Sequence, residues 1–130
     1  MPYKNNHAVD ELLENWEEVY KKGLLSFWIL LLLSDRRAYA YEMTLAITDI
    51  SHGTMTVDEN SVYRALNRFE SLGIVESEHE RSQVGPARRY YRLSETGAAL
   101  LEKFIERNIM VLQSPPVLER IQAALNRKDR

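Results

Sequence analysis

The sequence predicts a mainly α-helical protein with one small β-hairpin, arranged as a winged helix-turn-helix with extra helices before and after it. Residues 38–50 and 58–72 form two short amphipathic patterns joined by a turn at 51–54, which is typical of a helix-turn-helix. Directly after them, residues 74–93 contain two strand-like stretches around a Gly-Pro turn, which predict a hairpin. This order of elements is a sharper signal than either part alone.

Length and composition limit the classes of protein that fit. The 130 residues suit one domain with an extension, and 45% hydrophobic residues are enough to bury a core. The absence of cysteine excludes disulfides and cysteine-based metal or redox sites, and it favours a cytoplasmic location. The net charge of −2 and the pI of about 5.9 provide no overall attraction to nucleic acid, so a DNA-binding surface must concentrate positive charge locally.

The first helix is expected over residues 8–22, within an N-terminal segment 1–22, and Gly23 is expected to mark a bend. An apolar stripe at helical spacing runs along it, and acidic residues occupy the other side. The stripe consists of Val9, Leu12, Leu13, Trp16, Val19 and Tyr20. Because an acidic helix is a poor surface for DNA, the stripe is expected to pack on the core or on a second copy of the chain.

The one long apolar run follows, and it predicts a helix over residues 24–34 that is buried on most sides. The run is shorter than the ~20 residues that a membrane-spanning helix needs, and its position does not fit a signal peptide. Four aromatic residues of these first two helices could line an apolar pocket at a dimer seam, but packing in the core is the favoured interpretation. They are Trp16, Tyr20, Phe27 and Trp28.

The helix predicted over residues 58–72 has signals at both ends. Thr56 and Glu59 have the spacing of a capping box, and Asp58 is a competing N-cap. Gly73 can adopt the left-handed conformation that ends a helix. One apolar stripe is expected to face the core. It consists of Val62, Leu66, Phe69 and Leu72.

The opposite face of this helix carries side chains that can donate hydrogen bonds to base edges or phosphates. It consists of Asn60, Ser61, Tyr63, Arg64, Asn67 and Arg68. A helix in the major groove presents its N-terminal residues to the bases, and here those are Asn60, Ser61 and Arg64. Arg68 lies further along and is expected to contact phosphate. Tyr63 has a second interpretation, as a half-buried aromatic residue of the core.

The hairpin predicted over residues 74–93 supplies local positive charge, and its turn falls in residues 82–87, which are rich in turn formers. Its arginines are Arg81, Arg88, Arg89 and Arg92. Strand alternation places Arg88 and Arg92 on one side and Arg89 on the other. One of them is expected to pair with a glutamate of the facing strand. The candidate glutamates are Glu76, Glu78 and Glu80.

After the hairpin, residues 94–130 form a C-terminal helical segment. Apolar residues at three-to-four spacing predict a helix over residues 95–113, for which Ser94 and Thr96 are rival N-caps. The two prolines that follow break this helix. A last short amphipathic helix is expected after them.

The sequence lacks the residue patterns of an enzyme. His7, His52 and His79 are scattered and do not have the spacing of metal ligands. Glu17 and Glu18 are neighbours on a helix and point in different directions, which does not suit acid–base catalysis. Since no phosphate-binding glycine-rich loop or nucleophile motif is present, we expect no enzymatic activity, no metal and no cofactor.

Several segments between residues 22 and 100 together resemble the PadR family of transcriptional regulators. They are residues 39–43, 61–70, 72–75 and 85–97. The last is the most specific, since the family carries a similar Gly-Pro-x-Arg-Arg-x-Tyr run in its wing. Where the family commonly has Gly-Thr-Leu-Tyr-Pro, this chain has Asn-Ser-Val-Tyr-Arg at residues 60–64, on the expected base-reading face. Where the family commonly has Tyr-Gly-Tyr, this chain has Ala40 in place of the glycine.

The resemblance implies a sequence-specific DNA-binding regulator, commonly a repressor of nearby genes that a small-molecule effector releases. It implies a homodimer on a pseudo-palindromic operator, with one winged helix over residues 23–93 in each subunit. The recognition helix would enter the major groove and the wing would contact the backbone or the minor groove, with Tyr63 of the kind that the family uses near the backbone. Dimerisation would use the N- and C-terminal helices, in residues 1–22 and 94–130.

A winged-helix module that binds protein instead of DNA is the rival interpretation. The acidic pI and the glutamates of the predicted wing favour it slightly. The polar face of the second helix and the arginines of the wing argue against it.

Overall fold

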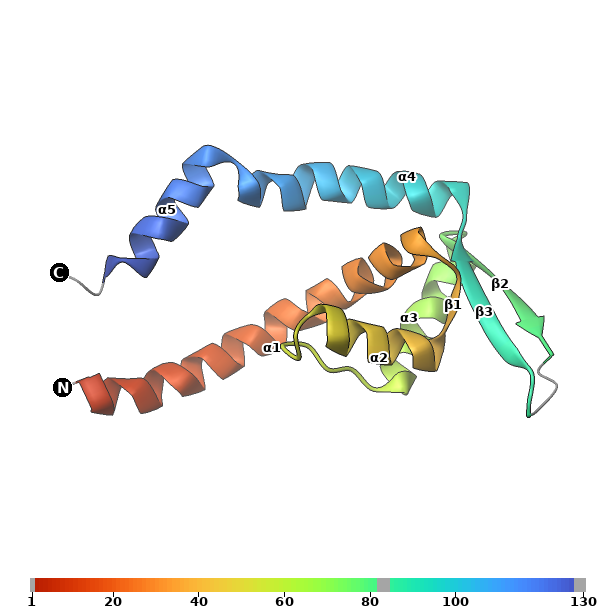
Figure 1. Cartoon of the computed structure of the whole chain (residues 1–130), viewed down its shortest axis with the longest axis horizontal. Helices are drawn as coiled ribbons and strands as arrows, with labels where there is room; N and C mark the ends of the chain where they lie inside the picture. Colours follow the sequence, from red (N-terminus) through yellow and green to blue (C-terminus); the bar gives the residue numbers. More distant parts are fainter. Residues whose placement is uncertain (1, 82–84, 128–130) are drawn as a thin grey trace.

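The computed structural model describes residues 2–81 and 85–127, with the side chains of residues 2–6 excepted. The helices are α1 (Pro2–Asp35), α2 (Ala40–Ile50), α3 (Glu59–Ser71), α4 (Glu95–Phe104) and α5 (Pro115–Leu125). The strands are β1 (Ala38–Tyr39), β2 (Val75–Glu80) and β3 (Arg88–Leu93). Figure 1 shows α2, α3 and the sheet gathered around the C-terminal half of α1, while the N-terminal half of α1 and α5 lie at the opposite end. The predicted fold class, a mainly helical winged helix-turn-helix, is confirmed.

α1 continues without interruption through Gly23, so the bend predicted there is wrong. The two helices predicted over residues 8–22 and 24–34 are one helix. A glycine inside a helix costs only about 1 kcal/mol relative to alanine. Packing of the apolar residues that follow Gly23 against the rest of the fold outweighs this cost.

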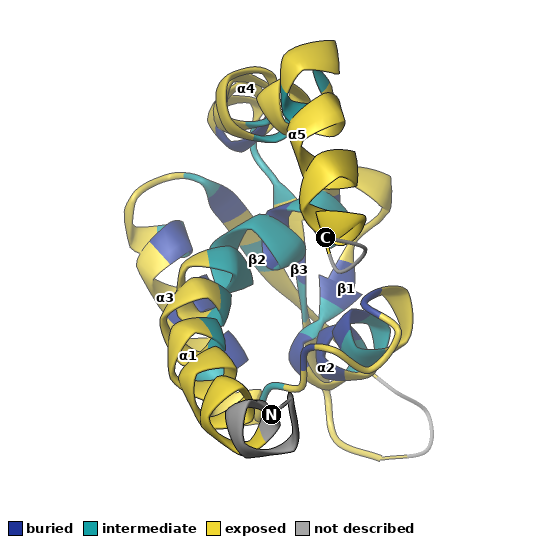
Figure 2. Ribbon diagram, turned by 90° about the vertical axis from the view of Figure 1, so that its left-hand side faces the viewer, coloured by how far each residue is buried: buried dark blue, intermediate teal, exposed yellow. Residues whose placement is uncertain are grey.

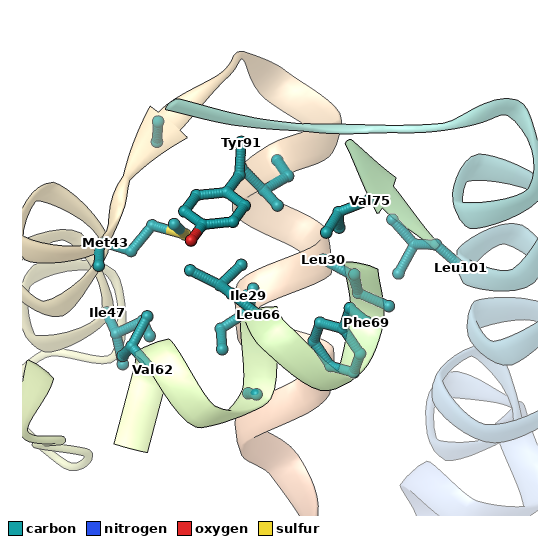
Figure 3. Packing of buried hydrophobic residues seen from close by; sticks show 14 of the residues in the cluster. Ile29, Leu30, Met43, Ile47, Val62, Leu66, Phe69, Val75, Tyr91 and Leu101 are labelled. Carbon is teal, nitrogen blue, oxygen red and sulfur yellow. The ribbon is translucent and has the colours of Figure 1, made fainter. Parts of the chain in front are cut away.

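The hydrophobic core forms where the C-terminal half of α1 meets α2, α3 and the sheet (Figure 3). Ile29 of α1, Met43 of α2 and Leu66 of α3 are completely buried in it, and Tyr91 of β3 enters from the sheet. The predicted apolar stripe of α3 packs here, with the exception of Leu72, which is 63% exposed. Leu72 is the C-cap residue, where the chain already leaves the helix.

The sheet has three antiparallel strands in the order β1-β3-β2. The pairing of β2 with β3 confirms the predicted hairpin. The helix predicted over residues 38–50 begins later, at Ala40, because Ala38 and Tyr39 form β1 and pair with β3. Of the turn predicted over residues 82–87, residues 82–84 lie outside the described residues.

The turn between α2 and α3 contains two consecutive residues in the left-handed region, His52 with φ 56° and Gly53 with φ 76°. The buried hydroxyl of Ser51 accepts a hydrogen bond from the N–H of Met55 at 3.1 Å. This closes the predicted turn and sets the direction in which the chain enters α3.

Asp58 caps α3, since its carboxylate accepts a hydrogen bond from the N–H of Ser61 at 2.7 Å. The capping box predicted for Thr56 and Glu59 is therefore wrong, and the competing cap is the one formed. Gly73, with φ 77°, follows the end of α3 in the left-handed conformation that the sequence predicted.

The C-terminal segment begins with α4, whose N-cap is Ser94. Residues 95–113 do not form the single regular α-helix that was predicted, because the type of helix changes along them. α4 passes into a π-helical turn, η1 (Ile105–Ile109), and a 3-10 turn, η2 (Met110–Gln113). α5 follows, with proline at the first helical position, where no backbone hydrogen bond is lost.

Two long stretches of this chain expose apolar side chains. Figure 2 colours most of α5 and of the N-terminal half of α1 as exposed. The N-terminal half of α1 exposes Val9, Leu12, Leu13, Trp16, Val19 and Tyr20. The segment from α4 to α5 exposes Leu100, Phe104, Met110, Val111, Leu112, Leu118, Ile121 and Leu125. Core packing was predicted for four aromatic residues and holds in part for Phe27 and Trp28, whereas Trp16 is 74% and Tyr20 55% exposed. None of the described helices has the length and apolar character needed to cross a membrane.

Candidate nucleic-acid interface

The polar face of α3 points to solvent. The buried residues of the helix, which include Val62, Leu66 and Phe69, hold the opposite face against the core and so fix the rotation of the helix. The residues left exposed are Asn60, Tyr63, Arg64, Asn67 and Arg68, with Ser61 partly exposed. All six side chains predicted for the polar face are therefore accessible on this chain.

Hydrogen bonds order the side chains at the start of α3. Arg64 Nη2 donates to Ser61 Oγ at 3.1 Å, and the N–H of Ser61 donates to Asp58. The hydrogen bonds from Ser61 lower the pKa of the Asp58 carboxyl below its usual value, and the positive charge of Arg64 contributes less. Arg64 is thus positioned in the first turns of α3, where a helix in the major groove approaches base edges.

Arg89 connects the hairpin to α3. Its Nη2 lies 3.1 Å from Oε1 of Glu70, and its Nε donates to Ser77 Oγ at 2.9 Å. Ser77 also donates to the Glu70 carboxylate. Arg89 was predicted to contact DNA, but here its charge already faces a carboxylate of α3.

Arg92 pairs across the hairpin with two glutamates of β2. Its Nε lies 3.2 Å from Oε1 of Glu76, and its Nη1 lies 3.7 Å from Oε1 of Glu78. The prediction that one arginine of the hairpin pairs with the facing strand is confirmed. These side chains are more than half exposed, so the pairs add little stability. They do offset the positive charge on this side of the hairpin.

Arg37, which lies just before β1, joins the same network and was not predicted. It pairs with Glu78 and Glu80, and its guanidinium lies 4.4 Å from the ring centre of Tyr90. The hydrogen bond to Glu80 is the main cause that raises the pKa of Arg37. No sequence signal could have located this contact, because it depends on the pairing of β1 with β3.

Arg81 and Arg88 are the arginines of the hairpin whose charge is not offset in this way. Within residues 2–81 and 85–127, no carboxylate lies in ion-pairing distance of either. Arg88 instead lies over the ring of Tyr39, 4.7 Å from its centre. The uncompensated positive charge of the hairpin therefore lies near its free end.

A concavity of about 520 Å³ separates the hairpin from the starts of α2 and α3. Its lining residues are Tyr39, Tyr41, Glu59, Tyr63, His79, Ala87, Arg88 and Arg89. Three of them, Tyr63, Arg88 and Arg89, were predicted as site residues. Tyr39, Tyr41 and His79 were not, because the fold brings them together from segments that are distant in sequence. In the described part of the chain, no group of three or more histidine, aspartate or glutamate side chains is arranged to hold a metal ion.

A model of the transcriptional regulator PadR-like family matches residues 29–103. A PadR-family regulator from Eggerthella lenta DSM 2243 is 25% identical with a TM-score of 0.69, over 92% of this chain and 96% of that one. A PadR-like regulator from Bacillus cereus strain ATCC 14579 is 32% identical with a TM-score of 0.65, over 78% of this chain and 94% of that one.

Bacillus subtilis PadR, solved in complex with operator DNA, is 18% identical with a TM-score of 0.61, over 65% of this chain and 48% of that one. At this identity the likeness concerns the fold alone. Among curated proteins, an uncharacterized protein of Lysinibacillus sphaericus is 26% identical over 85 residues, which are 65% of this chain and 78% of that protein.

Proposed function

Because this chain belongs to the PadR-like family of transcriptional regulators, we propose that it binds operator DNA as a homodimer and represses transcription from that operator. The observation that carries the proposal is the exposed polar face of α3, which lies beside a hairpin whose free end bears Arg81 and Arg88. Among the described residues, neither arginine has a carboxylate in ion-pairing distance. A helix held by its apolar side with donors on its free side suits insertion into the major groove.

In this proposal the N-terminal turns of α3 read the bases. Arg64 can bond guanine bidentately, and Asn60 can do the same with adenine. Ser61 lies beside them and is partly exposed. Tyr63, Asn67 and Arg68 lie where they can contact the flanking backbone, and the hairpin contacts the backbone or the minor groove with Arg81 and Arg88.

Dimerisation is proposed to use the two exposed apolar stretches, one on the N-terminal half of α1 and one on the segment from α4 to α5. Exposed apolar side chains gathered along helical segments in this way are typical of an interaction surface. Residues 1–22 and 94–130 would then serve dimerisation, and residues 23–93 would serve DNA binding. Two-fold symmetry would pair one α3 from each subunit with each half of a pseudo-palindromic operator.

The charge distribution predicts how the affinity for DNA depends on dimerisation and on salt concentration. The net charge is −2, and several arginines near the hairpin already face glutamates. A single subunit therefore has few cations for phosphate contacts, and we expect affinity to require the dimer and to fall steeply with salt. Release of the operator by a small-molecule effector is part of the proposal and follows from the family resemblance.

The proposal is tested with a labelled duplex from the promoter of the chain's own gene, measured by gel shift at about 50 mM and 200 mM salt. A shift that is selective over random DNA and weakens with salt supports it. The glutamates of β2 favour the rival function, a module that binds protein. Absence of a shift at the lower salt concentration would support that rival.

A further inference from the structure

The concavity between the hairpin and the starts of α2 and α3 contains hydrogen-bond donors that the fold itself does not use. Tyr41 is 53% and Tyr63 38% exposed. Among the described residues, no hydrogen bond joins the hydroxyl of either tyrosine to a neighbour. Because both rings line the same concavity, their hydroxyls are available to a molecule bound in it.

Among the residues described, the concavity offers one arginine whose charge is not already offset, so it can bind at most a singly charged anion. Two arginines line it, and the charge of Arg89 is already offset by Glu70. Arg88 has no carboxylate in ion-pairing distance within the described part of the chain, and its contact with the ring of Tyr39 holds it in place. His79, an exposed residue of β2, adds a further donor. Glu59 also lines the concavity and opposes an anion.

We propose that this concavity binds one phosphodiester of the operator backbone, with Arg88 supplying the charge and Tyr41 and Tyr63 donating hydrogen bonds. The inference rests on the proposed DNA binding and adds Tyr41, a residue of α2, to the interface. A phosphodiester has one negative charge, and tyrosine hydroxyls are ordinary donors to its oxygens. Backbone contacts of this kind fix the register of a protein on the duplex.

The location of the concavity favours the backbone as its occupant. The start of α3 and the start of β3 lie on the same side of the molecule, with the start of α2 between them (Figure 1). If α3 enters the major groove and the hairpin contacts the duplex beside it, the strand that borders the groove passes between the two elements. That path crosses the concavity.

The test pairs protein variants with duplexes in which single linkages of one half-site are replaced by neutral methylphosphonate. Wild type, Tyr41→Phe and Arg88→Gln are titrated against each duplex by fluorescence anisotropy. Arg36→Gln, an exposed arginine that pairs with Glu42, and Arg92→Gln, an arginine that pairs with Glu76, are the matched controls. Circular dichroism checks that each variant is folded, and Tyr41→Phe removes only a hydroxyl.

We expect one linkage, or two adjacent ones, whose neutralisation weakens wild-type binding about tenfold. The same neutralisation should weaken Arg88→Gln less than about twofold, since that variant has already lost the charged contact. It should weaken Tyr41→Phe less than it weakens wild type, but more than Arg88→Gln, because Arg88 still faces the phosphate there. The two controls should keep the full effect. Glu59→Gln should bind the unmodified duplex more tightly than wild type, because a carboxylate no longer opposes the phosphate.

If every neutralised linkage costs the variants as much as it costs wild type, the concavity binds no phosphate although DNA binding itself stands. If wild type binds no DNA at low salt, the proposed function and this inference fail together. Calorimetric titration with inorganic phosphate in the absence of DNA is the remaining arm. The proposal would be overturned if inorganic phosphate binds saturably, Arg88→Gln abolishes this binding, and no neutralised linkage in the duplex affects wild type more than the variants. The concavity would then be a site for a free anion.

Discussion

The guanidinium of Arg89 on β3 lies against the carboxylate of Glu70 on α3, with Nη2 3.1 Å from Oε1. Ser77 of β2 completes the contact by accepting from Arg89 and donating to Glu70. One cluster of hydrogen bonds therefore joins both strands of the hairpin to the helix that we propose reads the operator. These hydrogen bonds therefore fix the angle between the hairpin and α3 in the folded chain.

Glu70→Gln and Arg89→Gln are expected to weaken operator binding by the same factor, because each breaks the same contact. The double variant should bind no more weakly than either single variant. The stability lost by each should stay below about 1 kcal/mol, since both side chains are partly exposed. Anisotropy titrations at several salt concentrations measure the effect. A larger loss and a shallower salt dependence for Arg89→Gln alone would show that Arg89 itself contacts phosphate.

Gly97→Ala is expected to destabilise the chain by about 1–3 kcal/mol. A Cβ at Gly97 would lie 2.1 Å from the carbonyl oxygen of Ile74, which cannot move without shifting the start of β2. Gly23→Ala is the matched control, since a Cβ there would meet no atom within 4 Å. It should stabilise α1 by about 0.5–1 kcal/mol. Urea unfolding measures both, and an unchanged stability of Gly97→Ala would contradict the close approach of α4 to Ile74.

Asp58 is expected to stabilise the chain in a pH-dependent way. Its pKa is lowered in the folded chain, mainly by hydrogen bonds from Ser61, below the ordinary value of 3.8. The stabilisation is therefore complete above that ordinary value and is lost as the pH falls through the lowered, folded-state pKa. Unfolding free energies of wild type and Asp58→Asn, measured from pH 7 to about 2.5, test this. Asparagine also caps a helix, so a difference that does not change with pH would contradict this role of the Asp58 charge.

The parts of the fold that the sequence predicted correctly depend on local signals. Residues 58–73 carry both an apolar stripe and a closing glycine, and residues 74–93 contain two strand-like stretches around a Gly-Pro turn. Such signals do not depend on the rest of the chain. The bend at Gly23 was wrong because a single glycine is a weak local signal, and the packing of the residues after it decides the outcome.

The parts that could not be predicted depend on contacts between distant segments. β1 has only two residues, and it exists because β3 offers an edge to Ala38 and Tyr39. The partners of Arg37 and the lining of the concavity follow from that pairing. The apolar stripe of α1 was visible in the sequence. The sequence did not show whether other parts of the same chain would cover this stripe.

Trp16→Glu is expected to convert the proposed dimer to a monomer, because it places a charge in the middle of the exposed apolar stretch of α1. Leu72→Glu is the control, since Leu72 is similarly exposed at the end of α3 and lies outside both proposed dimer surfaces. Light scattering coupled to size-exclusion chromatography measures the mass. A wild-type chain that is already monomeric at micromolar concentration would contradict the dimer.

The most direct test of base reading by α3 is the affinity of Arg64→Ala for the operator and for random DNA of equal length. We predict a loss of about 1–3 kcal/mol on the operator, a much smaller loss on random DNA, and relaxed sequence choice in a variant that is still folded. Equal losses on both duplexes would instead make Arg64 a phosphate contact and would contradict the claim that this face of α3 reads sequence.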